Sequence, residues 1–77
     1  MAIQAISDQV YEDFLKLRIK NGQSPLTYEE FVTALETWYQ EFQEGNCSLG
    51  YAAAQLGITQ IDFIYLLDLL GWQATNL

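Results

Sequence analysis

The pattern that most narrows the fold of this chain lies in its second half, where two short helices are predicted to meet at a glycine. Ser48 precedes an alanine-rich segment, Gly57 follows that segment, and Thr59 precedes a run that is apolar at nearly every position. Serine and threonine are preferred residues at helix N-termini, and glycine accepts the left-handed conformation that often ends a helix. The spacing of Ala53, Gly57 and Phe63 is that of a small residue, a turn glycine and a buried apolar residue. We therefore predict that the chain ends in a helix-turn-helix.

Two further helices are predicted before this pair. Ser7 is placed to cap the first helix, which Gly22 ends, and Pro25 keeps it from resuming. Thr27 begins the second helix, and Glu30 three residues later completes the pattern of a capping box. Apolar residues recur at helical spacing through both segments. The predicted fold class is accordingly all-α, with four helices.

The first six residues allow two interpretations. They are short and mostly apolar, so they suit either a β-strand or a helical lead-in. With a strand, residues 1–44 faintly resemble a ribbon-helix-helix, in which strands pair across a dimer and one face enters the major groove. On that interpretation Gln4 alone could contact a base. Both alternatives stay open at this stage.

The length of 77 residues predicts a single domain. We divide it into an N-terminal helical pair (residues 1–44), the helix-turn-helix (45–72) and a tail (73–77). Trp72 is expected to fold back as a hydrophobic contact, whereas the tail after it is expected to fray.

The cellular setting is predicted from what the sequence lacks. The start has neither the charged opening nor the long apolar stretch of a signal peptide, and no run reaches the roughly 18 apolar residues that span a membrane. Cys47 is the single cysteine, so no internal disulfide can form. These observations favour a cytoplasmic protein that does not enter a membrane.

The charge of the chain argues against nucleic acid as its main partner. The formal net charge is −7, and the basic residues are Lys16, Arg18 and Lys20. A duplex-binding protein commonly makes roughly 6–10 phosphate contacts, more than three cations supply, although a dimer would double them. We favour the interpretation that these residues complement the C-terminal end of the first helix dipole, with Glu12 and Lys16 as an i,i+4 pair. An acidic surface favours a basic protein partner.

No group of residues indicates catalysis. The chain has no histidine, the side chain that most often acts as general base near neutral pH. Without histidine or a second cysteine, only weak carboxylate metal sites could form. Cys47 is interpreted as an ordinary turn cysteine, since no neighbouring cation would activate it. We therefore expect neither an enzyme nor a bound cofactor or metal.

The predicted fourth helix is apolar on nearly every side, which a domain this small cannot easily bury. Exposing several large apolar side chains would forgo an amount of free energy comparable to the stability of the domain. Part of this helix is therefore predicted to be an interface, the alternative being that the first two helices cover it completely. The residues assigned to this partner surface are Ile61, Ile64, Tyr65, Asp68, Leu69 and Trp72.

Residues 45–58, together with Phe63, Leu66, Leu67 and Gly71, resemble a widespread family of small prokaryotic proteins. Its common phrase has the form Gly-x-x-Ser-Leu-x-x-Ala-Ala-x-x-x-Gly-Ile, followed by a short helix that ends in glycine. Its members are described as antitoxins or as helix-turn-helix regulators, and the match covers about the last third of the chain. The resemblance implies a helix-turn-helix fold and one of those two roles.

Two functions are consistent with this sequence. The leading hypothesis is a small acidic protein-interaction module, antitoxin-like or an adaptor, homodimeric, that binds a basic partner protein such as a toxin through apolar helix surfaces. The alternative is a helix-turn-helix transcriptional regulator that binds DNA. The DNA contacts of that alternative would be Thr59, Gln60 and Tyr65 on bases, with Lys16, Arg18 and Lys20 on phosphates.

Overall fold

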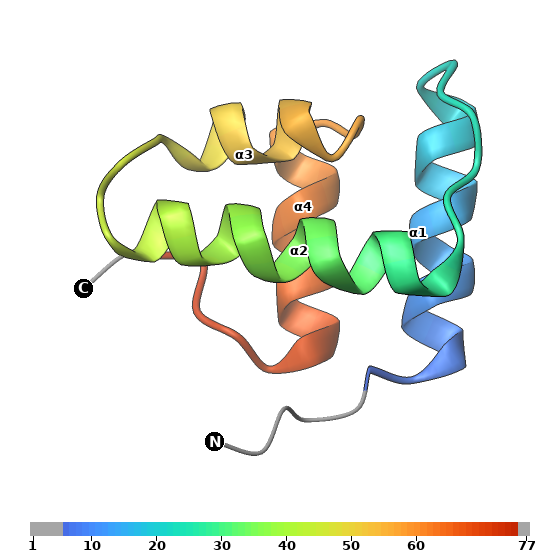
Figure 1. Cartoon of the computed structure of the whole chain (residues 1–77), viewed down its shortest axis with the longest axis horizontal. Helices are drawn as coiled ribbons and strands as arrows, with labels where there is room; N and C mark the ends of the chain where they lie inside the picture. Colours follow the sequence, from blue (N-terminus) through green and yellow to red (C-terminus); the bar gives the residue numbers. More distant parts are fainter. Residues whose placement is uncertain (1–5, 76–77) are drawn as a thin grey trace.

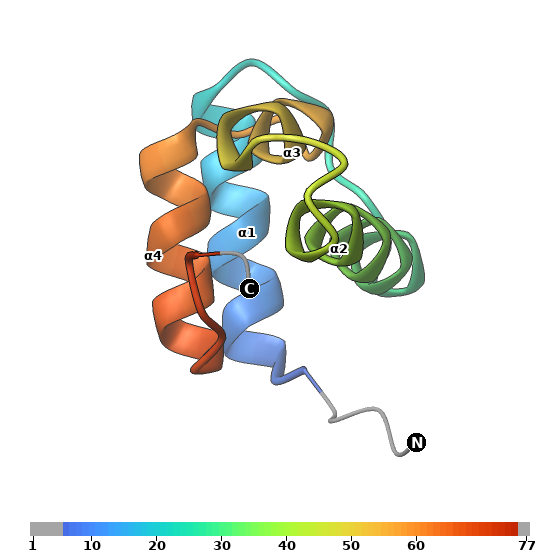
Figure 2. The same cartoon turned by 90° about the vertical axis from the view of Figure 1, so that its left-hand side faces the viewer.

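The computed structural model describes residues 6–75 and contains four helices in this range. In chain order they are α1 (Asp8–Lys20), α2 (Tyr28–Gln43), α3 (Leu49–Gln55) and α4 (Gln60–Leu70). α1 and α4 lie side by side and run in opposite directions, while α2 and α3 cross them (Figure 1; Figure 2). No strand occurs within residues 6–75, and the predicted all-α fold is confirmed.

The possible N-terminal strand falls almost wholly on residues 1–5, which lie outside the described residues, as does Gln4. Ile6 is described; it is buried, and its backbone oxygen accepts a hydrogen bond from the hydroxyl of Tyr28 on α2. The chain is therefore fixed to α2 just before α1 begins.

All four helices begin where the sequence predicts, because local side chains satisfy their first backbone N–H groups. In each helix the cap hydroxyl accepts a hydrogen bond from the backbone N–H three residues later. Glu30 and Asp62 return the interaction to the N–H of the cap residue, which completes two capping boxes. The capping residues are Ser7, Thr27, Ser48 and Thr59.

The turn between α3 and α4 brings the two helices to an angle of 92°. Gly57 lies in this turn with a φ of 78°, a left-handed conformation that strains residues with a Cβ. The angle falls in the range of helix-turn-helix pairs; that the pair is a helix-turn-helix, and that it acts on DNA, both stay predictions. Within residues 6–75 no single helix is long and apolar enough to cross a membrane; α3 and α4 reach that length and composition only together, across their bend.

The core is formed where the four helices meet. Phe14 of α1 and Phe31 of α2 lie with ring centroids 4.3 Å apart, and both are fully buried together with Phe63 of α4. Ala52 and Ala53 of α3 are also fully buried, and their small side chains allow α3 to approach α2 and α4 closely. The large side chains at the centre of the core are Phe14, Phe31, Phe63, Leu35, Leu56, Leu66 and Leu67.

The segment that follows α4 packs along α2, which corrects one prediction. Trp72 folds back as expected, and its ring lies 4.8 Å from the ring of Tyr39. The Tyr39 hydroxyl donates a hydrogen bond to the backbone oxygen of Gln73, and the Gln43 side-chain amide donates one to that of Thr75. The expectation of a frayed tail is therefore wrong as far as Thr75, because aromatic packing and two hydrogen bonds hold it.

Candidate functional site

The inner half of α4 is fixed by its ends and by the core. Thr59 and Asp62 form the capping box at its start, and Gly71 ends it with a φ of 74°. A glycine in this left-handed position allows the chain to reverse toward α2. The side chains that α4 buries are Asp62, Phe63, Leu66 and Leu67.

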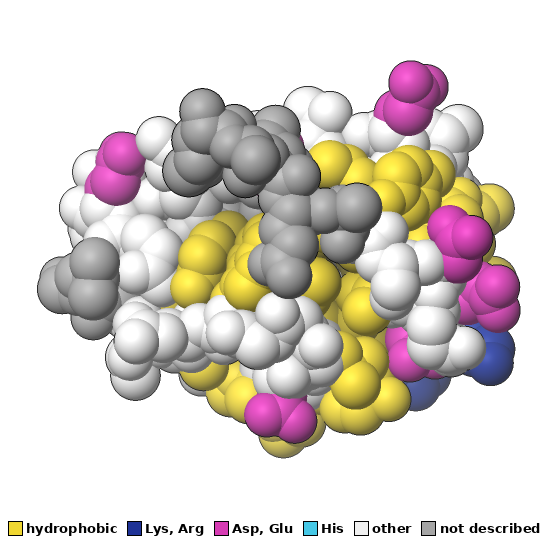
Figure 3. Space-filling view, turned by 90° about the horizontal axis from the view of Figure 1, so that it is seen from below, with side chains coloured by type: hydrophobic (Ala, Val, Ile, Leu, Met, Phe, Trp, Pro, Cys, Tyr) yellow, Lys and Arg dark blue, Asp and Glu magenta, His cyan; other side chains and the backbone are white. Residues whose placement is uncertain are grey.

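The outer half of α4 presents large apolar side chains to solvent. Ile61 is 79% exposed, Tyr65 49%, Leu69 44% and Ile64 41%. Residues three and four apart share one side of a helix, so these side chains and the exposed Asp68 form a single surface. We call this surface the α4 face: Ile61, Ile64, Tyr65, Asp68 and Leu69. On the lower side of the molecule, hydrophobic side chains reach the surface in several areas between polar groups, with acidic and some basic side chains toward the edges (Figure 3).

The helices of residues 6–75 thus cover one side of α4 and leave the other open. This arrangement follows from geometry, since three neighbouring helices in a domain this small reach only the side of α4 that points inward. Each large apolar side chain that is moved out of water contributes about 1.5–3 kcal/mol. Burial of the α4 face against a partner would therefore contribute several kcal/mol of free energy that the fold of residues 6–75 does not gain.

One residue assigned to the partner surface lies elsewhere. Trp72 is only partly exposed and packs against Tyr39 of α2, so its ring serves the fold and is not part of the α4 face. The placement of Trp72 is corrected accordingly. The chain reverses at Gly71, so Trp72 does not continue the helical path of α4.

Arg18, which was assigned to DNA phosphate or to the end of the first helix, is buried in the structure. It is 8% exposed, its Nη1 donates to the backbone oxygen of Leu56 at 2.8 Å, and its Nε donates to that of Ser24 at 2.7 Å. Its guanidinium also lies 5.9 Å from the ring centroid of Phe14. Arg18 therefore joins α1 to the α3–α4 turn, and a phosphate cannot reach it without breaking these contacts.

Lys20 forms the one salt bridge found among residues 6–75. Its Nζ lies 3.1 Å from Oδ1 of Asp62, which links the end of α1 to the start of α4. The predicted pair between Glu12 and Lys16 is not formed, and both side chains are exposed. Lys16, Arg18 and Lys20 therefore have separate surroundings.

Asp62 is a buried carboxylate held by several donors. Besides Lys20, the side-chain amide of Asn21 donates to Oδ2 at 3.1 Å, and the backbone N–H of Thr59 donates to the same oxygen. Burial by itself would raise the pKa of this carboxyl, but the hydrogen bonds from Lys20, Thr59 and Asn21 outweigh it and lower the pKa below its ordinary value. The sequence indicated only the capping role of Asp62.

We expect acid to weaken the fold partly through Asp62. Because its pKa is lower in the folded state, its contribution to stability is complete above the unfolded-state pKa of about 3.9 and is lost as the pH falls through the folded-state pKa. Asp62→Asn should lower the free energy of unfolding by about 1–3 kcal/mol at pH 7 and flatten its dependence on pH below about 4. Urea titrations across this pH range measure both effects. The exposed Asp68→Asn is the control; an Asp62→Asn variant with the wild-type pH profile would contradict the assignment.

The other candidate site residues lie at the start of α4 and in the connection between α2 and α3. Thr59 and Gln60 are exposed at the start of α4, although the hydroxyl of Thr59 is engaged in the cap. Cys47 is partly buried between α2 and α3, and burial together with the charge of Glu41 raises the pKa of its thiol. Such a thiol is a poor nucleophile at neutral pH. Within residues 6–75 no group of Cys, Asp and Glu side chains is arranged to hold a metal ion.

Comparison of the chain with protein-family models, with curated proteins and with solved structures gave no match. The function of the chain is therefore inferred from its geometry.

Proposed function

We propose that this protein is a small protein-interaction module, antitoxin-like or an adaptor, that binds a partner protein through the α4 face. The observation that carries this proposal is the row of exposed apolar side chains on α4, led by Ile61 at 79% exposure. An exposed apolar helix face of this kind is typical of a surface that packs against another protein. Tyr65 adds a ring that combines apolar area with a hydroxyl, a residue type common at the centre of interfaces.

The charge of the surface supports a basic partner. The net charge is −7, one of the three cations is buried and a second is paired with Asp62. Long-range attraction would therefore speed the approach of a positively charged protein, while the apolar contacts would hold it. A basic toxin, as the sequence resemblance implies, has this chemistry.

The size of the molecule sets a scale for the interface. A stable complex buries about 800 Å² on each partner, roughly a sixth of the total accessible surface of 4824 Å². The α4 face would form the apolar centre of such an area, with polar groups at its rim. We also propose that two copies pair through this face when no partner is bound, since apolar burial can offset the repulsion between acidic rims.

Substitution on the α4 face is expected to abolish binding without unfolding the protein. The double variant Ile61→Ser, Tyr65→Ser removes two exposed apolar side chains and should lower partner affinity at least about 100-fold, because each contributes about 1.5–3 kcal/mol when buried. Ile19→Ser is the matched control, since Ile19 is 62% exposed on α1 outside the α4 face. The readouts are capture of proteins from the host, with their identity and charge, and the mass in solution by sedimentation.

The proposal requires a basic protein that wild type and Ile19→Ser capture and the double variant does not. A strictly monomeric protein that captures nothing, or a partner that all three proteins retain equally, would refute it. Circular dichroism of the double variant establishes that its helices are intact.

A second candidate function is DNA binding by α3 and α4. The observation that favours it is their 92° angle, with Thr59 and Gln60 exposed at the start of α4. With Arg18 buried, at most Lys16 and Lys20 remain for phosphate in each protomer, against the roughly 6–10 contacts of duplex-binding proteins.

A gel shift against genomic fragments at low salt tests this second function. Lys16→Gln and Gln60→Ala should each weaken a genuine complex, because they remove a phosphate contact and a base contact. The absence of any shift at micromolar protein excludes the function.

A further inference from the structure

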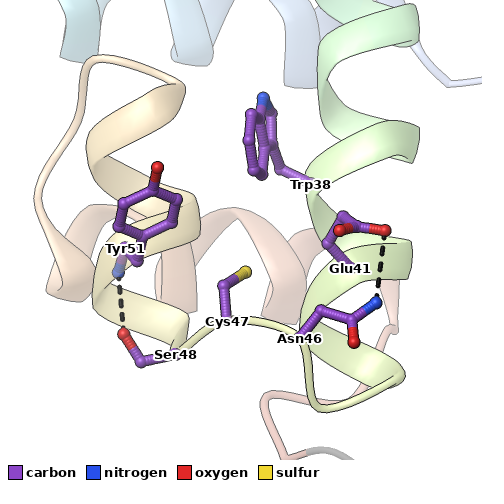
Figure 4. Close-up of a pocket in the computed structure, with 6 residues that line it drawn as sticks. All are labelled: Trp38, Glu41, Asn46, Cys47, Ser48 and Tyr51. Atoms are coloured by element: carbon purple, nitrogen blue, oxygen red, sulfur yellow. Dashed lines mark hydrogen bonds between the residues drawn. The ribbon is translucent and has the colours of Figure 1, made fainter.

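A pocket lies between the second half of α2 and the start of α3, away from the α4 face. Its volume is about 520 Å³, and it is open to solvent. Trp38 and Glu41 reach it from α2, Tyr51 reaches it from α3, and the connection between the two helices forms its floor (Figure 4). The residues that line it are Trp38, Glu41, Asn46, Cys47, Ser48 and Tyr51.

Two aromatic rings form adjoining walls of this pocket. The ring centroids of Trp38 and Tyr51 are 5.8 Å apart and the ring planes meet at 69°. Tyr51 is 52% exposed, so about half of its side chain is open to a ligand. The faces of aromatic rings carry partial negative charge, and tryptophan and tyrosine attract cations that lie over them.

A carboxylate completes the negative character of the pocket. Glu41 lies one helical turn after Trp38, on the side opposite Tyr51 (Figure 4). The Asn46 amide donates to it at 3.5 Å, a long contact that leaves the carboxylate able to accept further donors. The charge of Glu41 acts on the pocket: burial and this charge together raise the pKa of the Cys47 thiol. None of the lining residues is basic.

We infer that this pocket binds a guanidinium group, the side chain of an arginine presented by a protein partner. The flat group can lie over the rings of Trp38 or Tyr51 while its N–H donors reach the carboxylate of Glu41. Arginine is favoured over lysine because guanidinium stacks on aromatic faces, matches a carboxylate with paired donors and is less strongly hydrated. The pocket is thus a second recognition site, which selects one side chain where the α4 face offers general apolar contact.

The test uses small ligands and does not depend on binding at the α4 face. N-acetyl-arginine amide presents the side chain without terminal charges, and N-acetyl-citrulline amide is its neutral counterpart of nearly equal shape. In two-dimensional amide NMR, we expect the arginine ligand to shift the indole N–H signal of Trp38 and the signals of residues 46–51. Trp72→Phe identifies which of the two indole signals belongs to Trp38. The citrulline ligand should bind at least about fivefold more weakly.

Variants assign the binding to individual groups. Glu41→Gln should weaken binding about fivefold or more, and Tyr51→Leu should weaken it about threefold or more. Glu29→Gln, which removes an equal charge at the other end of α2, should leave it unchanged. Circular dichroism shows whether each variant remains folded.

Three outcomes would overturn the inference. They are no shift at ligand concentrations up to about 20 mM, equal binding of the citrulline ligand, and equal loss of binding in Glu29→Gln and Glu41→Gln. A fourth concerns the source of the group. Free arginine that binds much more tightly than the capped ligand would mark the pocket as an amino acid site and exclude the partner side chain.

Discussion

Replacing Arg18 with methionine is expected to lower the free energy of unfolding by about 2–4 kcal/mol. Methionine retains most of the buried aliphatic length but provides no donor. The backbone oxygen of Leu56 would then be left inside the protein without its partner at 2.8 Å, and that of Ser24 would lose the donor at 2.7 Å. An unsatisfied buried carbonyl costs about 1–3 kcal/mol, more than the net gain from a hydrogen bond that forms.

Urea denaturation followed by circular dichroism measures this effect. Lys16→Met is the control, because Lys16 is exposed on the same helix and its replacement should change stability by less than about 0.5 kcal/mol. A loss below about 1 kcal/mol in Arg18→Met would show that the α3–α4 turn does not depend on Arg18.

Gly57→Ala is expected to destabilise the protein by about 2–3 kcal/mol, for two separable reasons. A residue with a Cβ at a φ of 78° costs about 1 kcal/mol or slightly more. In addition, the new Cβ would lie 2.5 Å from Nη1 of Arg18 and 2.9 Å from Cγ of Gln23, so the guanidinium would have to leave its hydrogen bonds. The steric clash should therefore add about 1–2 kcal/mol to the conformational cost of about 1 kcal/mol.

Gly22→Ala separates the two reasons. Gly22 has a nearly equal φ of 75°, but a Cβ there would meet nothing within 4 Å, so only the conformational cost of about 1 kcal/mol is expected. In an Arg18→Met background, Gly57→Ala should cost less than in the wild-type background, because the guanidinium is gone and only the contact with Cγ of Gln23 remains. Equal losses in Gly22→Ala and Gly57→Ala, or strict additivity with Arg18→Met, would contradict the predicted contact.

Much of the fold could be read from short stretches of sequence because the interactions that set helix ends are local. Thr27 and Glu30 satisfy each other's backbone groups across three residues, as do Thr59 and Asp62. Gly71 ends α4 through its own conformation. Such features depend only on neighbours along the chain, so composition and spacing suffice to predict them.

The candidate site was predicted in part, because the apolar composition of one helix is also a local property of the chain. The sequence showed that α4 is too apolar for a domain of this size, and the structure confirms that Ile61, Ile64, Tyr65 and Leu69 are exposed. Trp72 was expected to fold back and it does, but its contact with Tyr39, 33 positions earlier in the chain, was not predicted, and Trp72 was therefore also assigned to the partner surface. No local pattern indicates that contact.

The roles of Arg18 and of the pocket were beyond sequence reasoning. Arg18 and Leu56 are 38 residues apart, and only the packing of α1 against the α3–α4 turn brings them within 2.8 Å. Trp38 and Tyr51 similarly meet because α2 and α3 pack together. A cation in an amphipathic helix and two aromatic residues in the next helices carry no signal of their eventual neighbours.

The sequence by itself determined where the helices begin and end and that the last of them has more apolar surface than the domain can bury. The tertiary structure alone decided which side of α4 stays exposed, that Arg18 serves the interior, and that Trp38, Glu41 and Tyr51 share a pocket. The physical reason is range: capping and helical spacing act over three or four residues, whereas burial and charge pairing depend on groups that only the folded chain brings together.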